Sequence, residues 1–598
     1  MNSPSPLLLS GSLAVFTVKV EGETIPSTFQ VVSIETFNAV NRLPKARLTI
    51  YDGNPAQANF PISNLDMFLP GKNITITAGY EQQQTAIFGG IIVSQSIEID
   101  QSSASKLIVE ITDEAMAMTL ERRNAVFEKT TDSDLIKKLI SSNGLGADVA
   151  ATTTVYEDIV QYYATDWDLM VMRAELNGFV VITDAGKVSV KAPDTESTPV
   201  LQVTYGDSIL ELEAEMNAAT QYLSSAIKSY SWDDATQQMV ESGPGPLTVT
   251  EPGNVSSDEL AKTFSVETYA QQTGAMIPSA ALQDWSTAEL LKSKLSKIRG
   301  HVRFQGSALA KTGSMIQLAG LGGRFNGPAY IGGVSHNITN GRWTTSVSFG
   351  LAWPWFASET PSVSAPGASG QLPPIQGLQT GKVKQVATDP EGEFRVLVEL
   401  PILGSGSAAV WARLGSFYAS NNFGAVFYPE PGDELIVAFM NNDPRCPVIV
   451  GSVYSKQLPP AYPPQESNDI KAIVTRTKLE LVFDEKNKAL EIKTPGKRSV
   501  RLDDNAGTIT ISDPNNNSIT LSSSGITIDS AKDLVLKAAA NVTISAGAAL
   551  SMSATTDATL KGMQVSHTAT GSFQAHGGTA ALTATGTTTI TGLMVNIN

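Results

Sequence analysis

The stretch ITLSSSGITIDSAKDLVLKAAANVTISAGAALSM (519–552) decides the fold of the C-terminal part of this chain. Apolar triplets recur in it, first ITL (519–521) and then ITI, LVL, VTI and LSM. The first residues of successive triplets lie seven and then eight residues apart, and the step of eight continues to ATL (558–560). A fixed short period predicts a repeat architecture in which each unit contacts only its neighbours.

Eight residues supply one strand and one corner, which is too short for a full coil of a single-chain β-helix. Three chains that each contribute one face would close the coil and bury the apolar positions at a shared axis. One chain alone would leave a row of Ile, Val and Leu in water and its strand edges unpaired. The spacing therefore predicts a homotrimeric, intertwined β-prism. The alternative is a low-complexity disordered tail, which the preserved apolar register disfavours.

The composition excludes several classes of function. Of the 598 residues, 42% are apolar and 17% are charged, and the formal net charge is −16. An acidic chain is a poor ligand for nucleic acid or anionic lipid. The lone Cys446 excludes an internal disulfide. No basic residue precedes the N-terminal apolar run, and no run is long enough to cross a membrane, so we expect cytoplasmic synthesis without a signal peptide.

The first 356 residues alternate between β-rich segments and three predicted helices. The helices are DSDLIKKLISSNG (132–144), TDWDLMVMRAELNG (165–178) and STAELLKSKLSKIRG (286–300). Capping-box spacing predicts the starts of the last two, at the pairs Thr165/Asp168 and Ser286/Glu289. Packing helices on a β scaffold is the simplest interpretation of these segments.

A Ser-, Pro- and Gly-rich linker (357–374) separates this region from a compact β unit of about 80 residues. Many short strands with Gly-rich turns suit an oligonucleotide-binding (OB) barrel. The unit has five basic and eight acidic residues, so the barrel is plausible and nucleic-acid binding is not. A second Pro-rich joint follows the barrel.

No catalytic, cofactor-binding or metal-binding set stands out. His567 and His576 could gather about a metal on a three-fold axis, but nothing else in the sequence supports a metal there. The stretch GSGSAA (404–409) fits a dinucleotide-binding pattern, yet a strand rather than a helix follows it. The remaining candidates are four carboxylates of the barrel turns, which we interpret as turn caps: Glu430, Asp433, Glu434 and Asp443.

The stretch GAVFYPEPGDELIVAFMNNDPRCPVIVGSVYS (424–455) closely resembles the barrel of the VgrG family, the spike proteins of type VI secretion systems and related contractile injection machines. Residues 300–356 resemble the end of that family's hub, in the versions found in extracellular phage-tail-like particles. TTTITGLMVNIN (587–598) is similar to the family's blunt spike end. The matching barrel residues are Pro429, Gly432, Asp433, Glu434, Asn442, Asp443, Pro444, Pro447, Gly451 and Tyr454.

The resemblance implies a mainly β fold with a small α+β insert, a hub of two β-barrels, an OB barrel and a trimeric β-prism. We expect the domains at the following residues: first hub barrel 1–120, insert 121–200, second hub barrel with the helix 286–300 at 201–356, linker 357–374, OB barrel 375–455, linker 456–475 and prism 476–598.

The implied function is that of a non-enzymatic homotrimeric central spike of a contractile injection system. It would combine a baseplate hub with a membrane-puncturing needle, and it would be ejected from an assembled particle on contraction. The implied partners are a hexameric inner tube protein, baseplate proteins, a PAAR-repeat tip protein and effector cargo. The candidate tip interface is Leu593, Met594, Val595, Asn596, Ile597 and Asn598. The alternative is a trimeric β-helical tail enzyme, such as a depolymerase or a tail lysozyme. The kind of machine stays open among secretion system, free particle and phage tail.

Overall fold

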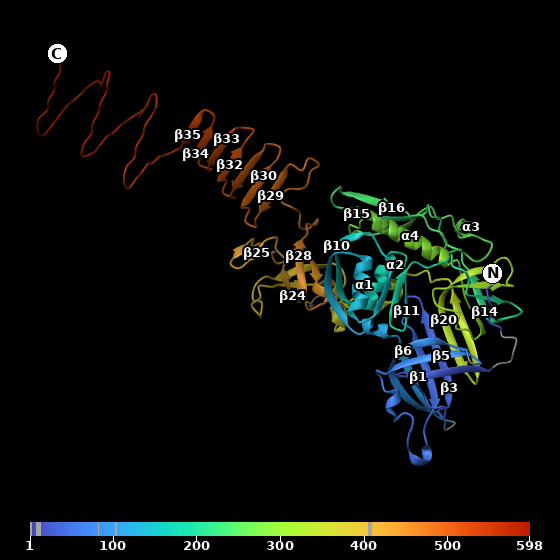
Figure 1. The fold of residues 1–598 in the computed structure, drawn as a ribbon. Helices are drawn as coiled ribbons and strands as arrows, with labels where there is room; N and C mark the ends of the chain where they lie inside the picture. Colours follow the sequence, from blue (N-terminus) through green and yellow to red (C-terminus); the bar gives the residue numbers. More distant parts are fainter. Residues whose placement is uncertain (1–2, 8–12, 82, 102–103, 405–408, 598) are drawn as a thin grey trace. The chain divides into compact units, whose positions relative to one another are not determined.

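The computed structural model describes the chain except for residues 1–2, 8–12, 82, 102–103, 405–408 and 598. The chain folds as two compact units, Met1–Val453 and Tyr454–Asn598 (Figure 1). The fold is mainly β, as the sequence predicts. No helix in the described part of the chain is long and apolar enough to cross a membrane.

A 13-stranded sheet forms the frame of the first unit. Its order is β14-β18-β21-β20-β3-β4-β7-β6-β5-β1-β2, and β13 and β19 join it through β20. Its strands are β1 (Ala14–Val20), β2 (Glu23–Thr24), β3 (Val31–Ala39), β4 (Lys45–Tyr51), β5 (Asn73–Tyr80), β6 (Gln83–Ile99), β7 (Ser105–Thr112), β13 (Leu201–Thr204), β14 (Ile209–Met216), β18 (Ile298–Gln305), β19 (Met315–Ala319), β20 (Gly327–Thr339) and β21 (Arg342–Phe349).

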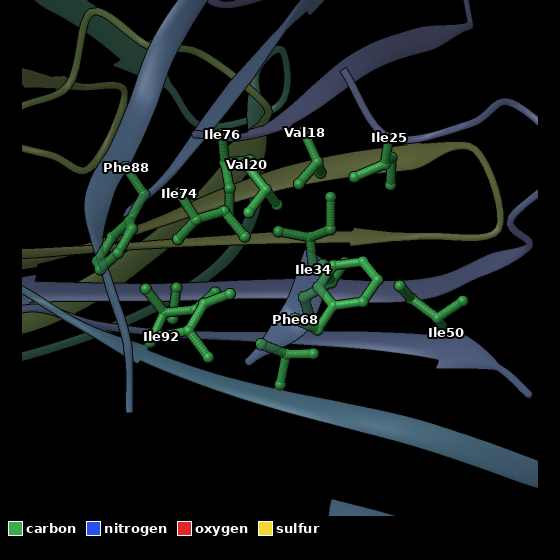
Figure 2. Packing of buried hydrophobic residues seen from close by; sticks show 14 of the residues in the cluster. Val18, Val20, Ile25, Ile34, Ile50, Phe68, Ile74, Ile76, Phe88 and Ile92 are labelled. Atoms are coloured by element: carbon green, nitrogen blue, oxygen red, sulfur yellow. The ribbon is translucent and has the colours of Figure 1, made fainter. Parts of the chain in front are cut away.

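Two separate cores lie on this sheet. Alternating apolar residues of β1 and β3–β7 point into the first core, which also takes in Phe68 (Figure 2). The second core gathers side chains of β13, β18, β19, β20 and β21. Pairing of β3 with β20 joins the two lobes. The two expected hub barrels are thus two lobes of one continuous sheet with a core each.

His336 lies at this junction between the lobes. It sits on β20, opposite Thr36 of β3 and Thr345 of β21, and only 6% of it is exposed. Its Nδ1 lies 2.9 Å from the Thr345 Oγ1, and its ring packs on Trp343. Burial lowers the pKa of the His336 imidazole to about 4, so the ring is neutral at pH 7.

The α+β insert packs two helices on short strands. The elements are β8 (Arg122–Thr131), α1 (Asp132–Ser142), β9 (Gly146–Val149), β10 (Val155–Thr165), α2 (Asp166–Leu176), β11 (Val180–Asp184) and β12 (Lys187–Lys191). Thr165 caps α2, since its hydroxyl accepts a hydrogen bond from the Asp168 amide at 3.0 Å. The predicted start of this helix is confirmed.

The predicted start of the third helix is wrong. Helix α4 runs from Ser279 to Leu295, so Ser286 and Glu289 are buried inside it and do not cap it. The apolar residues of SAALQDW extend the helical face upstream of the expected cap, and residues 298–300 belong to β18. A true capping box, Ser256 with Glu259, begins the unpredicted helix α3 (Ser257–Ala261).

The remaining elements of the first unit include a closed five-stranded barrel, which confirms the predicted OB-type barrel. The barrel order is β22-β23-β24-β28-β27. Its strands and the other short elements are β15 (Ile227–Asp233), β16 (Gln238–Ser242), β17 (Tyr269–Gln272), α5 (Phe356–Glu359), β22 (Gln379–Gln385), β23 (Val396–Glu399), β24 (Ala409–Leu414), β25 (Ala419–Ser420), β26 (Phe423–Gly424), β27 (Glu434–Phe439) and β28 (Pro447–Ser452).

The second unit is an antiparallel meander in which strands pair in chain order (Figure 1). Its strands are β29 (Ile470–Val474), β30 (Glu480–Asp484), β31 (Ala489–Lys493), β32 (Ser499–Asp503), β33 (Thr508–Ser512), β34 (Ser518–Ser522) and β35 (Gly525–Asp529). Residues 530–597 contain no helix or strand, and the side chains of residues 531–597 are exposed.

The burial of His336 predicts a pH dependence of stability. The folded pKa of about 4 lies below the ordinary value of 6.5, so the unfolded chain takes up the proton first and stability falls as the pH drops from 6.5 towards 4. By pH 4.5 this group alone costs about 2.5 kcal/mol. Urea unfolding at pH 7.5 and 4.5 should show that His336→Gln loses less stability than the unmodified protein.

The matched control is His301→Gln, because His301 is half exposed and lies on β18 of the same sheet, with β21 between it and β20. This variant shows the effect of removing an exposed imidazole from the same sheet. Equal pH dependence of the His336→Gln variant and the unmodified protein would contradict the assignment.

Candidate functional site

Strands β30 to β35 of the meander carry one wholly apolar face. Residues at alternate positions of each strand face the same side, and two cross-strand rows result from the register. The first row is Leu481, Ile492, Val500, Ile511, Ile519 and Ile528. The second row is Phe483, Leu490, Leu502, Ile509, Leu521 and Ile526. We call these twelve residues the apolar face.

Burial on this face is the reverse of what a folded sheet shows. On β33, Ile509 and Ile511 are 40% and 45% exposed, whereas Thr508, Thr510 and Ser512 are less exposed as a class. Ile526 on β35 is 70% exposed. Side chains of this size stabilise a fold by about 1.5–3 kcal/mol each when they are fully buried. The exposed side chains of the apolar face do not make this contribution in full within the single chain.

The apolar face is hollowed into an open groove of about 560 Å³. Five residues of the first row line the groove, and Leu534 extends it beyond the last strand. The lining is mainly apolar, so the groove fits another apolar surface better than water.

The opposite face of the meander is mixed at its start, where Val482 is buried, and becomes polar along the chain. Near its start it also carries ion pairs, Lys493 with Glu480 at 3.1 Å and Arg501 with Asp503 at 2.8 Å. On β33 and β34 the same face presents Thr and Ser in place of charges. The polar part of this face is better suited to contact with water than the apolar face.

The sequence pattern missed the upstream half of the apolar face. Equivalent positions of the first row are 481, 492, 500, 511 and 519, so steps of eleven and eight alternate. Turns of unequal length hide a period that becomes regular only after residue 519. The signal in the sequence that could have predicted this half was the pair of apolar residues two positions apart in each short segment.

The eight-residue step continues through the part of the chain without strands. Its apolar positions are all exposed, at fractions between 56% and 81% for Leu534, Leu536, Val542, Ile544, Leu550, Met552 and Leu560. Exposed apolar residues therefore continue at regular spacing from the apolar face toward the C-terminus.

The predicted tip residues lie in the same extended segment. Leu593, Met594 and Ile597 are among the most exposed apolar residues of the chain, and Val595 is 47% exposed. Asn596 is exposed too, and Asn598 lies outside the described residues. The structure brings these residues to no folded site, so their role at a tip interface stays a prediction.

The two histidines of the repeat are not brought together. His567 stacks on Phe573 with ring centroids 5.9 Å apart, and the His576 Nε2 lies 3.4 Å from the Gln574 Oε1. No group of three His, Cys, Asp or Glu side chains in the described ranges could hold a metal ion. A metal on a shared axis stays an untested alternative.

The first turn of the family motif leads into barrel strand β27. Gly432 has φ +97°, a conformation that favours glycine, and its amide donates to the Val383 carbonyl at 2.9 Å. The Asp433 carboxylate accepts from the Glu430 amide at 2.8 Å, and Glu434 begins β27 after Pro429 opens the turn. The turn thus fixes the register between β22 and β27.

The second motif turn is held by one carboxylate. Asp443 accepts from the amide, Nε and Nη2 of Arg445, and these hydrogen bonds lower the pKa of Asp443 below its ordinary value. Arg445 also donates to Gln371 at 3.0 Å, which ties residues 357–374 to the barrel. Asn442 has φ +55°, and Pro444 and Pro447 bracket Arg445 before β28.

The Asp433 and Asp443 carboxylates therefore accept the hydrogen bonds that hold the two turns. The GSGSAA stretch that begins at Gly404 leads into strand β24 and not into the helix that a dinucleotide-binding pattern requires. Gly406 lies outside the described residues. Gly451 sits at an irregularity between β27 and β28, and Tyr454 is 75% exposed.

Curated relatives of the chain are spike proteins of type VI secretion. The spike protein VgrG1b of Pseudomonas aeruginosa is 21% identical over 362 residues, which are 56% of this chain and 47% of the relative. VgrG4b of the same organism is 30% identical over 119 residues, 19% of this chain and 14% of the relative. The chain therefore spans less than half the length of each.

Three family models match the chain in sequence order. The Alg8 N-terminal domain matches residues 10–340, more than half of the chain. The type VI secretion system/phage-baseplate injector OB domain matches residues 379–454, and the phage baseplate V C-terminal trimerisation domain matches residues 489–598. The chain is a VgrG-type spike protein of the Alg8 N-terminal domain family.

Solved structures similar to this VgrG-type chain come from phage tails and type VI secretion. An Escherichia coli component of the type VI secretion system covers 73% of this chain and 99% of its own, with 13% identity and a TM-score of 0.36. A 43 kDa prophage tail protein of Shewanella oneidensis covers 57% of this chain, with 12% identity and a TM-score of 0.44.

The two motif glycines of this VgrG-type chain allow a matched test. A Cβ at Gly432 or at Gly451 would meet no heavy atom within 4 Å, but only Gly432 has a positive φ. Gly432→Ala should cost about 1–2 kcal/mol because L residues resist this conformation. Gly451→Ala should change stability by less than about 0.5 kcal/mol. Urea unfolding of both variants gives the comparison, and equal losses would contradict the role of the turn.

Proposed function

We propose that the chain is the non-enzymatic, homotrimeric central spike of a contractile injection system. The observation that carries this proposal is the uncovered apolar face, which lies within the segment matched by a trimerisation domain. Two further copies supply the surface that this face lacks, so three chains close around one dry axis.

The trimer accounts for the two faces of the meander. Around a three-fold axis the apolar rows point inward, while the ion pairs and the Thr and Ser side chains point to water. The segment 530–597 finds strand partners in the other two chains, because each eight-residue repeat forms one strand and one corner. The backbone donors and acceptors of residues 530–597 are then paired between chains.

Such a needle suits a mechanical role. Continuous strand pairing and a packed axis make it stiff, and residues 541–598 carry one acid, Asp557, and one base, Lys561. The net charge of −16 per chain therefore lies almost wholly outside the last 58 residues. A nearly uncharged stiff tip concentrates force on a target envelope and allows membrane puncture.

The hub supplies the attachment to the rest of the machine. Each chain offers two sheet lobes, so three chains present six, which fits a hexameric inner tube protein above them. Baseplate proteins surround this hub, and a PAAR-repeat protein binds the needle end at 593–598. Effector cargo is delivered with the spike.

The protein joins the baseplate of an assembled particle and leaves with the tube on contraction. A tail enzyme is not favoured, since the exposed lining of the groove on the meander is mainly apolar and residues 541–598 carry a single acidic residue, Asp557. Assays of the purified protein on peptidoglycan and capsular polysaccharide should detect no cleavage, and cleavage would contradict the non-enzymatic role.

Substitutions on the two faces of one strand test the trimer. Ile511 lies on the apolar face, and its neighbour Thr510 lies on the opposite face of β33. Ile511→Asp places three carboxylates at the dry axis and should shift the protein to monomers, because unpaired charges resist burial. Thr510→Asp should leave the trimer intact.

Sedimentation of the full-length protein measures the outcome. The unmodified protein and the Thr510→Asp variant should sediment at three times the chain mass of 63.3 kDa. If the unmodified protein sediments as a folded single subunit, the result would contradict the proposed function. A trimer that tolerates Ile511→Asp as well as Thr510→Asp would place the axis on another face.

A further inference from the structure

The α+β insert contains a two-stranded ribbon whose outer face is exposed. Strands β8 and β10 pair with each other and with no further strand in the described part of the chain (Figure 1). Phe127 and Ile159 lie on the inner face of the ribbon and pack in the core of the insert. Alternate residues of the same two strands point to the other side. We define the ribbon face as these exposed outward residues, which are Asn124, Val126 and Glu128 of β8 and Asp158, Val160 and Tyr162 of β10.

The ribbon face carries uncovered apolar side chains. The register places Val126 directly opposite Val160, and these side chains are 60% and 58% exposed. Tyr162, the next outward residue of β10, is 65% exposed. Cross-strand pairs of β-branched and aromatic side chains stabilise a sheet. A partner that covers this part of the face removes apolar surface from water.

The ribbon face also carries two carboxylates directly opposite each other, those of Glu128 and Asp158. Like charges at this position destabilise a strand pair. Neither carboxylate has an ion-pair or hydrogen-bond partner among the described side chains, and the neighbouring base Lys129 forms no ion pair there either. A base from a partner would offset the repulsion between the two carboxylates.

Strand β10 offers a free edge beside these residues. The backbone groups along an unpaired strand edge can pair with an added strand. Two hydrogen bonds fix the shape of the ribbon at its bulge. The Gln161 Nε2 donates to the Asp166 carboxylate at 2.9 Å, and the Asn124 Oδ1 accepts from the Tyr163 amide at 2.7 Å. An edge that is already in shape lowers the entropic cost of adding a strand.

The charge of the ribbon face selects the class of partner. Its charged groups are the two carboxylates, and Glu157 next to Asp158 is exposed too. This charge disfavours nucleic acid and an anionic lipid surface. It also disfavours another copy of the chain, which carries a net charge of −16. An added strand that matches β10 has a base and an apolar residue at alternate positions, opposite Asp158 and Val160.

We propose that β10 is a docking edge for an extended segment of a second protein in which basic and apolar residues alternate. The segment pairs with the backbone of β10 as a third strand of the ribbon. Its base lies against Asp158, and its apolar residue lies against Val160. This inference goes beyond the proposed spike trimer and does not depend on it.

Photocrosslinking in the full-length protein tests the docking. The photoreactive residue p-benzoylphenylalanine replaces Tyr162 in one sample. In the control sample it replaces Tyr205, which is 69% exposed and lies between β13 and β14. The probe is the synthetic heptapeptide Thr-Tyr-Thr-Val-Thr-Lys-Thr, and its twin has Glu in place of Lys. The lysine peptide should label the Tyr162 sample several-fold more than the glutamate peptide does. It should also label the Tyr162 sample several-fold more than the Tyr205 sample.

A charge reversal in the Tyr162 sample tests the contact with Asp158. Asp158→Lys should reverse the preference, so that the glutamate peptide gives the higher yield. The matched control is Asp234→Lys, because Asp234 is an exposed carboxylate between β15 and β16. This control should keep the preference for the lysine peptide. Urea unfolding should show that Asp158→Lys is at least as stable as the unmodified protein, since it removes the like-charge pair.

Three results would overturn the docking edge. The first is equal labelling of the Tyr162 sample by both peptides, a comparison that needs no charge variant. The second is a preference that Asp158→Lys leaves unchanged. The third is a link from Tyr162 to another copy of the chain, which would assign the edge to self-association. None of these results bears on the proposed spike trimer, which sedimentation tests separately.

Discussion

The structure depends on one constraint, which is that the apolar face of the meander has no cover within its own chain. Twelve large side chains in two cross-strand rows point to the same side, and on β33 and β34 the Thr and Ser side chains between them are the better buried. A sheet with such an uncovered apolar face is not stable as a lone layer in water. The proposed association of three chains would cover this face, and the proposed spike function rests on that association.

The hub obeys a different constraint. Its two lobes bury their own cores within one chain, and the pairing of β3 with β20 merges them into a single sheet. Neutral His336 lies at that junction. The two lobes of the hub therefore pack within one chain, whereas the second unit leaves its apolar face uncovered, which the proposed trimer would bury.

The sequence predicts the parts of the fold whose signals are local. The step of eight after residue 519, the Thr165 cap and the two barrel turns all depend on residues close together in the chain, and the structure bears out the cap and the barrel. The prediction that Ser286 caps a helix was wrong because apolar residues further upstream extend α4 to Ser279. The shared hub sheet depends on strand pairing between residues far apart in the chain. The start of the apolar face, at Leu481 and Ile492, depends on turns of unequal length. No local sequence pattern predicts either feature. The tip interface and the domain boundaries stay predictions.

Hydrogen–deuterium exchange of the full-length protein tests the shared axis most directly. Residues 534–552 make no strand pairing within their own chain, so their amides are protected only if other chains pair with them. The account predicts slow exchange there, comparable with that of β33 and β34. Exchange at the rate of an unstructured peptide throughout 534–552 would contradict it.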